Sequence, residues 1–215
     1  GAGNAVNNDG LTSSSSITFV LSASIAGIAA PNINSFECSL DGSSFSTCTS
    51  PAQFSGLSEG AHIMEVISVD NSGNRDLSPA SFTWTVDTVP PNTIIDSAKD
   101  DNNNTLTDGS STESTSITFT FSGTDSSIDE AEEGGINRFE CSVDRSSFST
   151  CTSPVRYDNI SNGTHIVEMR TVDNAGNLDP SPSSFAWIVN TIQQDDTVVD
   201  NVTSTGPTPT NLADT

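Results

Sequence analysis

Residues 36–51 read FECSLDGSSFSTCTSP, and residues 139–154 read FECSVDRSSFSTCTSP. The match continues through VDNSGNRDLSPASFTWTV (69–86), which recurs as VDNAGNLDPSPSSFAWIV (172–189) at the same displacement of 103 positions. Two copies of one folding unit therefore make up most of the chain. A residue that holds the same place in both copies is expected to serve the shared scaffold instead of a single active site.

The chain length fits two domains of small-sandwich size. With 215 residues and a period near 100, we place domain 1 at residues 1–91, domain 2 at residues 92–192 and a C-terminal tail at residues 193–215. Only 6 residues are Lys or Arg against 28 Asp or Glu, for a formal net charge of −22. This charge disfavours nucleic acid and anionic membranes as partners, and no stretch is long and apolar enough to predict membrane insertion.

The four cysteines fall into two pairs, Cys38 with Cys48 and Cys141 with Cys151, each inside one repeat. This arrangement predicts two intradomain disulfides in an exported protein. The alternative is a metal site. It is disfavoured because CxxC spacing is absent and the histidines lie in a different segment from the thiols.

Apolar and small polar residues alternate through much of each repeat. SITFVLSAS (16–24) and SITFTFSGT (116–124) show the period of two that predicts strands with one buried face. Asp41-Gly42 marks a hairpin tip, and Arg145 replaces that glycine in the second copy, so the turn cannot depend strictly on glycine. Strands of this length between turn signals predict an all-β chain of two antiparallel sandwiches.

The combined pattern FxCSxDxxxFxxCTSP, GxHxxExxxVDxxGNxD and SPxxFxWxV covers nearly all of residues 11–192. It resembles the Ig-like (fibronectin-III-like) tandem repeats of archaeal and bacterial secreted surface proteins, including S-layer-type, adhesin-like and filament subunits. The resemblance implies two tandem Ig-like β-sandwich domains and an extracellular, cell-surface setting. It brings no catalytic motif with it.

The chemistry-bearing residues do not predict an enzyme. His62 and His165 hold matching positions in the two repeats, which favours a structural role, and the chain contains no GxSxG elbow, Walker loop, HExxH or nucleotide fingerprint. Trp84 and Trp187 lie in alternating closing strands, where core packing is favoured over sugar stacking.

Calcium is the one cofactor worth weighing. The loops at 70–76 and 173–179 gather oxygen donors around a glycine turn, as calcium sites do. The candidate calcium ligands are Asp70, Asp76, Asp173 and Asp179. The alternative is that these side chains stabilise the turns by binding their own backbone.

N-linked glycans attach to exposed asparagines in Asn-x-Ser/Thr sequons. Four such candidates occur, at Asn103, Asn159, Asn162 and Asn201. Chance occurrence in a chain rich in Ser, Thr and Asn is the competing explanation.

The two repeats differ at their opening strand. Residues 93–100 (TIIDSAKD) stand where the first edge strand of domain 2 belongs, and aligning Ile17 with Ile117 leaves nothing in domain 1 to match them. Beyond domain 2, Thr197, Val198, Val199 and Asp200 match residues 93–96 at a displacement of 104. A sandwich without an edge strand exposes unpaired backbone and core, and a matching strand from a neighbour can fill it.

These features predict a non-enzymatic subunit of an extracellular filament or pilus-like surface polymer. Each subunit donates residues 197–200 to domain 1 of the next, so the partners are identical subunits in a head-to-tail homopolymer. The alternative is a two-module spacer or ligand-binding fragment of a larger adhesin or S-layer protein, with contacts to a cell surface or glycans. A third reading is an accessory sandwich of a secreted hydrolase.

Overall fold

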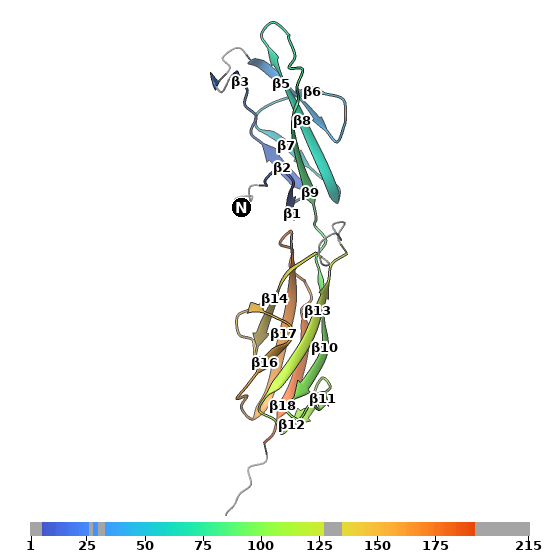
Figure 1. Cartoon of the computed structure of the whole chain (residues 1–215), viewed down its shortest axis with the longest axis vertical. Helices are drawn as coiled ribbons and strands as arrows, with labels where there is room; N and C mark the ends of the chain where they lie inside the picture. The colour runs from blue at the N-terminus through green and yellow to red at the C-terminus, as the bar shows by residue number, and fades with distance from the viewer. Residues whose placement is uncertain (1–5, 26–27, 30–32, 127–134, 192–215) are drawn as a thin grey trace, which may run out of the picture.

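The computed structural model describes residues 6–25, 28–29, 33–126 and 135–191. The described chain is built from strands and turns that form two β-sandwiches arranged end to end along one long axis (Figure 1). Among the described residues, no helix is long and apolar enough to cross a membrane. The predicted all-β fold with two Ig-like sandwich domains is confirmed.

Domain 1 contains β1 to β9, and its largest sheet has the strand order β1-β9-β8-β5-β6. The remaining strands form two separate pairs, β2-β7 and β3-β4. The bounds are β1 Gly10–Thr12, β2 Ser16–Phe19, β3 Ser24–Ile25, β4 Ile28–Ala29, β5 Ile33–Leu40, β6 Ser46–Cys48, β7 Ala52–Ser55, β8 Gly60–Asp70 and β9 Ala80–Val86.

Domain 2 contains β10 to β18 and repeats the five-stranded sheet as β12-β18-β17-β14-β15. Its second sheet has four strands in the order β11-β10-β13-β16. The bounds are β10 Asn92–Asp100, β11 Thr105–Leu106, β12 Ser111–Thr112, β13 Ile117–Thr124, β14 Ile136–Val143, β15 Ser149–Cys151, β16 Val155–Tyr157, β17 Gly163–Asp173 and β18 Ser183–Val189.

Each domain has its own core around one tryptophan. Trp84 is 1% exposed and Trp187 is fully buried, which is the core position expected for both. Phe19 meets Trp84 edge-on at 5.5 Å between ring centroids, and Phe119 meets Trp187 at the same distance. Such aromatic pairs add about 0.5–1.5 kcal/mol beyond the burial of their area.

The hairpin tips use a left-handed turn in both repeats. The backbone φ is 52° at Asp41 and 72° at Gly42, and it is 51° at Asp144 and 61° at Arg145. Positive φ at both central residues is the conformation that joins two strands without splaying them. Arg145 therefore adopts a backbone conformation that glycine adopts without steric penalty. The turn nevertheless forms in domain 2 without glycine.

A histidine ties each of these turns to the neighbouring strand. His62 Nε2 donates to the Ser58 carbonyl at 2.9 Å and its Nδ1 lies 2.8 Å from Asp41 Oδ2, while His165 makes the same contacts with Ser161 and Asp144. Both ring nitrogens face oxygens that only accept, so the protonated imidazolium satisfies both contacts. Burial lowers the pKa of His62, but the hydrogen bonds to Ser58 and Asp41 outweigh it and the net pKa is raised.

Candidate functional site

The two domains differ in the strands that pair with β13 in domain 2 and with its equivalent, β2, in domain 1. In domain 2, β13 pairs with β10 on one side and with β16 on the other. In domain 1, the equivalent strand β2 pairs only with β7, the equivalent of β16. Within the described part of domain 1, no strand takes the place of β10, so the outer edge of β2 is open.

The open edge shortens the strand. The sequence pattern predicts a strand over residues 16–24, but β2 ends at Phe19 and residues 20–23 are irregular. In domain 2 the matching half of β13, Thr120 to Thr124, is paired only with β10, because β16 reaches no further than Phe119. Residues 20–23 therefore lack the ladder that holds their counterparts extended, and the predicted length was wrong for this reason.

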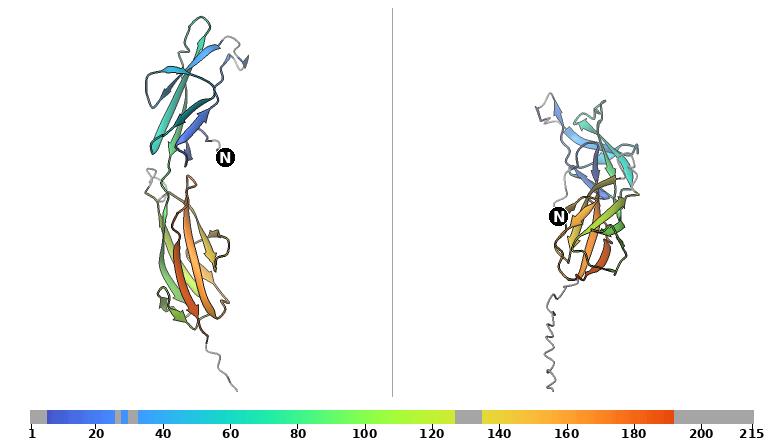
Figure 2. Two further views of the ribbon diagram at one scale, coloured as in Figure 1. Left: turned by 180° about the vertical axis from the view of Figure 1, so that it is seen from behind. Right: turned by 60° about the horizontal axis from the view of Figure 1, so that its bottom comes forward.

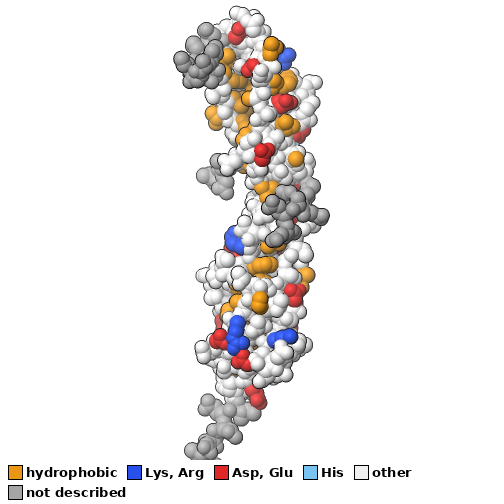
Figure 3. Space-filling view, viewed as in Figure 1, with side chains coloured by type: hydrophobic (Ala, Val, Ile, Leu, Met, Phe, Trp, Pro, Cys, Tyr) orange, Lys and Arg blue, Asp and Glu red, His pale blue; other side chains and the backbone are white. Residues whose placement is uncertain are grey.

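The core of domain 1 is left partly uncovered. Ile117 and Phe119 are fully buried and Phe121 is 3% exposed, because β10 covers them. Their counterparts Ile17, Phe19 and Leu21 are only partly buried. The same apolar pattern thus reaches solvent in one domain and not in the other. Hydrophobic side chains come to the surface along domain 1 in the space-filling view (Figure 3).

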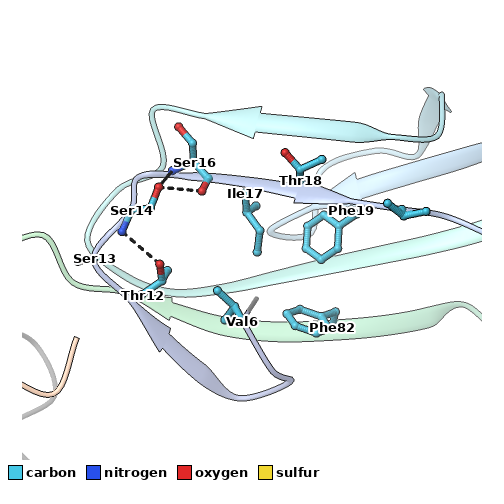
Figure 4. A pocket seen from close by; sticks show the side chains of 10 residues that line it. Val6, Thr12, Ser13, Ser14, Ser16, Ile17, Thr18, Phe19 and Phe82 are labelled. Carbon is cyan, nitrogen blue, oxygen red and sulfur yellow. Dashed lines mark hydrogen bonds between the residues drawn. The ribbon is translucent and has the colours of Figure 1, made fainter. Parts of the chain in front are cut away.

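A groove of about 540 Å³ lies along this edge. Ile17 and Phe19 point from β2 into it, toward Val6 and Phe82 on the opposite side (Figure 4). Its remaining lining is Thr12, Ser13, Ser14, Ser16, Thr18 and Val20. No lining side chain is charged, although the chain carries a net charge of −22. An apolar floor beside unpaired backbone is suited to an added strand with apolar side chains on one face.

The groove lies beside β1 and β2, in the half of domain 1 that is nearer to domain 2 (Figure 1). The connection between β8 and β9 lies at the upper end of Figure 1, and β18 ends at the lower end. The two views in Figure 2 show the same end-to-end arrangement. The candidate donor residues Thr197, Val198, Val199 and Asp200 follow β18 but lie outside the described residues.

Both disulfides join the strands that form the repeated hairpin. Cys38 is bonded to Cys48 and Cys141 to Cys151, each with a Cα–Cα distance of 5.8 Å. These are the two pairs that the sequence predicts, and each links the second strand of a hairpin to the first. No free cysteine occurs in the described chain.

The predicted calcium ligands use their carboxylates within their own loops. Asp70 Oδ1 accepts the backbone N–H groups of Ser72 and Asn74, and Asp173 Oδ1 accepts that of Asn177. The second oxygen of each aspartate accepts the asparagine side-chain amide. Asp76 and Asp179 cap the following turn in each repeat. These are the turn-stabilising contacts of the alternative reading.

Three carboxylates meet at the junction between the domains. One oxygen each from Asp87, Asp125 and Asp173 lie within 4.8 Å of one another, a spacing that could hold a metal ion. Burial raises the pKa of Asp87, and the charges of Asp125, Asp173 and Glu59 raise it further. Of these three, only Asp173 is among the calcium ligands that the sequence predicts. The other two come from the linker and from the loop after β13, and no spacing signal connects them.

Calcium binding stays a prediction. The measurement that checks it is the unfolding midpoint with calcium and after chelation, because an ion bound only by the native state raises that midpoint. We expect chelation to lower it by several degrees. An unchanged midpoint across a wide calcium range would leave the loop aspartates with their turn contacts alone.

Three of the four candidate glycosylation sites are described and exposed: Asn103, Asn159 and Asn162. Asn162 Oδ1 also accepts the backbone N–H and the hydroxyl of Thr191, which closes domain 2. Asn201 lies outside the described residues. Glycan occupancy stays a prediction, and intact-mass measurement of native protein checks it.

No protein-family model matches the chain, and no curated protein matches it. Among solved structures it is similar to the fibronectin(III)-like modules of Clostridium thermocellum CbhA, with 17% identity and a TM-score of 0.45 over 86% of this chain and 90% of that one. It is also similar to the extracellular domains of the putative one component system BT4673 and the putative hybrid two component system BT3049 from B. thetaiotaomicron. The first has 10% identity and a TM-score of 0.35 over 66% of this chain and 26% of that one. The second has 14% identity and a TM-score of 0.39 over 68% and 22%. These scores carry no functional argument, and the fold rests on the strand order and register described above.

Proposed function

We propose that this protein is a non-enzymatic subunit of an extracellular filament that assembles head to tail by donor-strand complementation. One observation carries the proposal: domain 1 has an open β2 edge and a partly uncovered core, whereas its twin is closed by β10. Residues 197–200 of the tail match residues 93–96 of β10, and they follow the closed domain in the sequence. The tail of one subunit is then the strand that domain 1 of the next subunit lacks.

The energetics favour such a contact. Burying a valine-sized side chain stabilises by about 1.5–3 kcal/mol, and the added strand also satisfies the unpaired backbone groups of β2. The acceptor edge belongs to domain 1 and the donor residues follow domain 2, so acceptor and donor are different surfaces and the contact is heterologous. Repeating an open head-to-tail contact generates a fibre.

The extracellular setting is supported by the disulfides. Two bonded pairs in a chain of 215 residues are characteristic of oxidising compartments. A single-sign negative charge keeps such subunits soluble and apart until a specific contact forms. The identical subunit is the partner, and nucleic acid and anionic membranes are disfavoured by the same charge.

The test is assembly of the full chain and of two variants. One variant is truncated after Thr191, and the other is an assembly-blocked full chain carrying Val198→Asp and Val199→Asp, which places charge against the apolar groove. Electron microscopy should show fibres with a repeat of about two domains for the full chain only. A peptide of residues 195–205 should stabilise domain 1 of either variant without restoring fibres, because it fills the groove but links nothing.

Normal fibres from the truncated chain would refute donor-strand exchange. The second candidate function is a spacer within a larger adhesin or S-layer protein, and the end-to-end arrangement of two sandwiches favours it (Figure 2). In a spacer the groove is filled by another part of the same polypeptide. The full chain then stays monodisperse in electron micrographs, and the 195–205 peptide gives no stabilisation.

A further inference from the structure

The start of β10 is held by a buried set of polar contacts in domain 2. The Thr93 N–H donates to Asp179 Oδ2 at 2.9 Å, and the Thr93 hydroxyl lies 2.8 Å from that of Thr171. The Ser183 hydroxyl donates to the Thr93 carbonyl at 2.6 Å. Thr93, Thr171 and Asp179 are all buried. Buried polar groups must find hydrogen-bond partners. These contacts therefore favour a register of the strand that places a threonine at the position of Thr93.

The same loop in domain 1 has the same local geometry, but within the described part of the chain no strand contacts it as β10 contacts its counterpart in domain 2. The Asp76 N–H donates to the Ser68 carbonyl at 2.9 Å, as that of Asp179 does to Thr171 at 3.0 Å. Asp76 Oδ1 accepts the Ser78 N–H at 2.9 Å, as Asp179 Oδ1 accepts that of Ser181 at 2.8 Å. Asp76 Oδ2, which corresponds to the oxygen that binds Thr93, contacts no donor among the described residues, and Asp76 is exposed.

We propose that Asp76, in the connection between β8 and β9, recognises the start of the donor strand, and that its Oδ2 accepts the backbone N–H of Thr197 from the neighbouring subunit. This inference rests on the proposed donor-strand function and adds to it the contact that sets the register. Ser68, which replaces Thr171 in domain 1, keeps a hydroxyl for the Thr197 side chain. The tail keeps a threonine at this place as well.

This register decides which tail residues enter the groove. In domain 2 a bulge lies between Ile95 and Ser97, so Ile95 pairs with Phe121 while Ala98 pairs with Phe119. Ile95 packs on the core and Ala98 is 1% exposed, whereas Ile94 is 47% exposed. Moved by 104 positions, the inward residues become Val199 and Val202, and Val198 faces water.

A specific contact is needed because the apolar residues of the tail do not define a single register of the donor strand. Val198 and Val199 are adjacent, and a slip of one residue exchanges the inward and outward faces of a strand. Burial alone discriminates weakly between two valines. A carboxylate that accepts the N–H of one particular residue distinguishes the two registers. In this register Asp200 stands at the bulge, where its counterpart Asp96 accepts the hydroxyl of Ser122 at the surface.

The test is a binding cycle on the assembly-blocked full chain. Isothermal titration measures the affinity of the 195–205 peptide and of the same peptide methylated at the backbone nitrogen of Thr197. Methylation of Thr197 removes the N–H donor whose counterpart, the Thr93 N–H, is bonded to Asp179 Oδ2 in domain 2. We expect methylation to weaken binding by about 10- to 100-fold, the range of a hydrogen bond to a charged group.

The variant Asp76→Asn should weaken the unmethylated peptide by a similar factor and should make binding insensitive to methylation, which shows that the two groups interact. Asp70→Asn is the matched control, because Asp70 bonds only within its own loop, and it should leave the affinity unchanged. Equal binding of both peptides to the Asp76 chain would overturn this inference and leave donor-strand exchange intact. Absence of binding by either peptide would refute both proposals.

Discussion

Domain 1 and domain 2 have nearly the same sequence pattern and different degrees of burial. Phe119 is fully buried and Phe19, its counterpart, is only partly buried, although both meet a tryptophan at the same distance. The difference lies in one strand, β10, which domain 2 possesses and the described part of domain 1 lacks. A core in a sandwich therefore depends on its edge strands as much as on its own apolar residues.

The largest expected effect is on fibre assembly, and it should differ between the two faces of the proposed donor strand. Val202→Asp in the full chain should abolish fibres, because it places a charge against Phe19, whereas Val198→Asp should leave assembly intact. Electron microscopy and sedimentation measure the outcome. Loss of fibres with Val198→Asp alone, and normal fibres with Val202→Asp, would mean that the strand docks in the opposite register.

The second prediction concerns the matched phenylalanines. Phe119→Ala should lower the free energy of unfolding of domain 2 by about 3–5 kcal/mol. Phe19→Ala in the assembly-blocked chain should lower that of domain 1 by only about 1–2 kcal/mol, because its ring is already partly in water. Urea unfolding followed by ¹⁹F NMR of fluorotryptophan reports each domain separately, since each contains one tryptophan.

Adding the 195–205 peptide should enlarge the cost of Phe19→Ala toward that of Phe119→Ala. In the proposed complex the peptide covers the ring of Phe19 and closes the open edge of β2. Equal costs of the two substitutions without peptide would contradict the view that domain 1 is incomplete.

The third prediction is a pH dependence that both domains share. Burial lowers the pKa of each histidine, but hydrogen bonds outweigh this effect and the net pKa is raised. The partners are Ser58 and Asp41 for His62, and Asp144 and Ser161 for His165. A raised folded-state pKa gives stability that is present below about pH 6.5 and is lost as pH rises through the folded value. Unfolding midpoints should therefore fall between pH 6 and pH 9, and His62→Gln should flatten the profile of domain 1 only.

The fourth prediction concerns Asp87, whose counterpart at the end of domain 2 is Asn190. Its pKa is raised by burial and by neighbouring carboxylates, so its charged form is disfavoured in the folded chain. Without added metal, Asp87→Asn should raise stability at pH 7, and the gain should vanish as pH falls through the raised pKa. Thermal unfolding at pH 4 and pH 7 checks the sign, and a loss of stability at pH 7 without metal would contradict it.

The smallest expected effect is at the hairpin tips. Arg145→Gly should stabilise domain 2 by about 0.5–1 kcal/mol, because glycine adopts the φ of 61° without a Cβ clash. Gly42→Arg should destabilise domain 1 by a similar amount. Urea unfolding of both variants measures the two changes, and an unchanged midpoint for both would mean that the turn tolerates either residue equally.

Local patterns predicted much of the fold. The alternation in residues 116–124 and the β-branched run 93–100 correspond to β13 and β10, and cysteine spacing anticipated both bonded pairs. The prediction failed at residues 20–23, where the apolar alternation is present but the strand is not. The reason is that pairing, not periodicity alone, holds a strand extended.

By itself, the sequence determined the repeat, the two disulfide pairs and the buried tryptophans. Each depends on spacing or alternation within a short segment, and such signals survive without knowledge of the fold. Only the tertiary structure decided that Asp87, Asp125 and Asp173 meet at the junction and that Asp76 Oδ2 contacts no donor among the described residues. Those features depend on side chains from segments that are far apart in the chain and are brought together by packing. Such contacts produce no periodic pattern in the sequence.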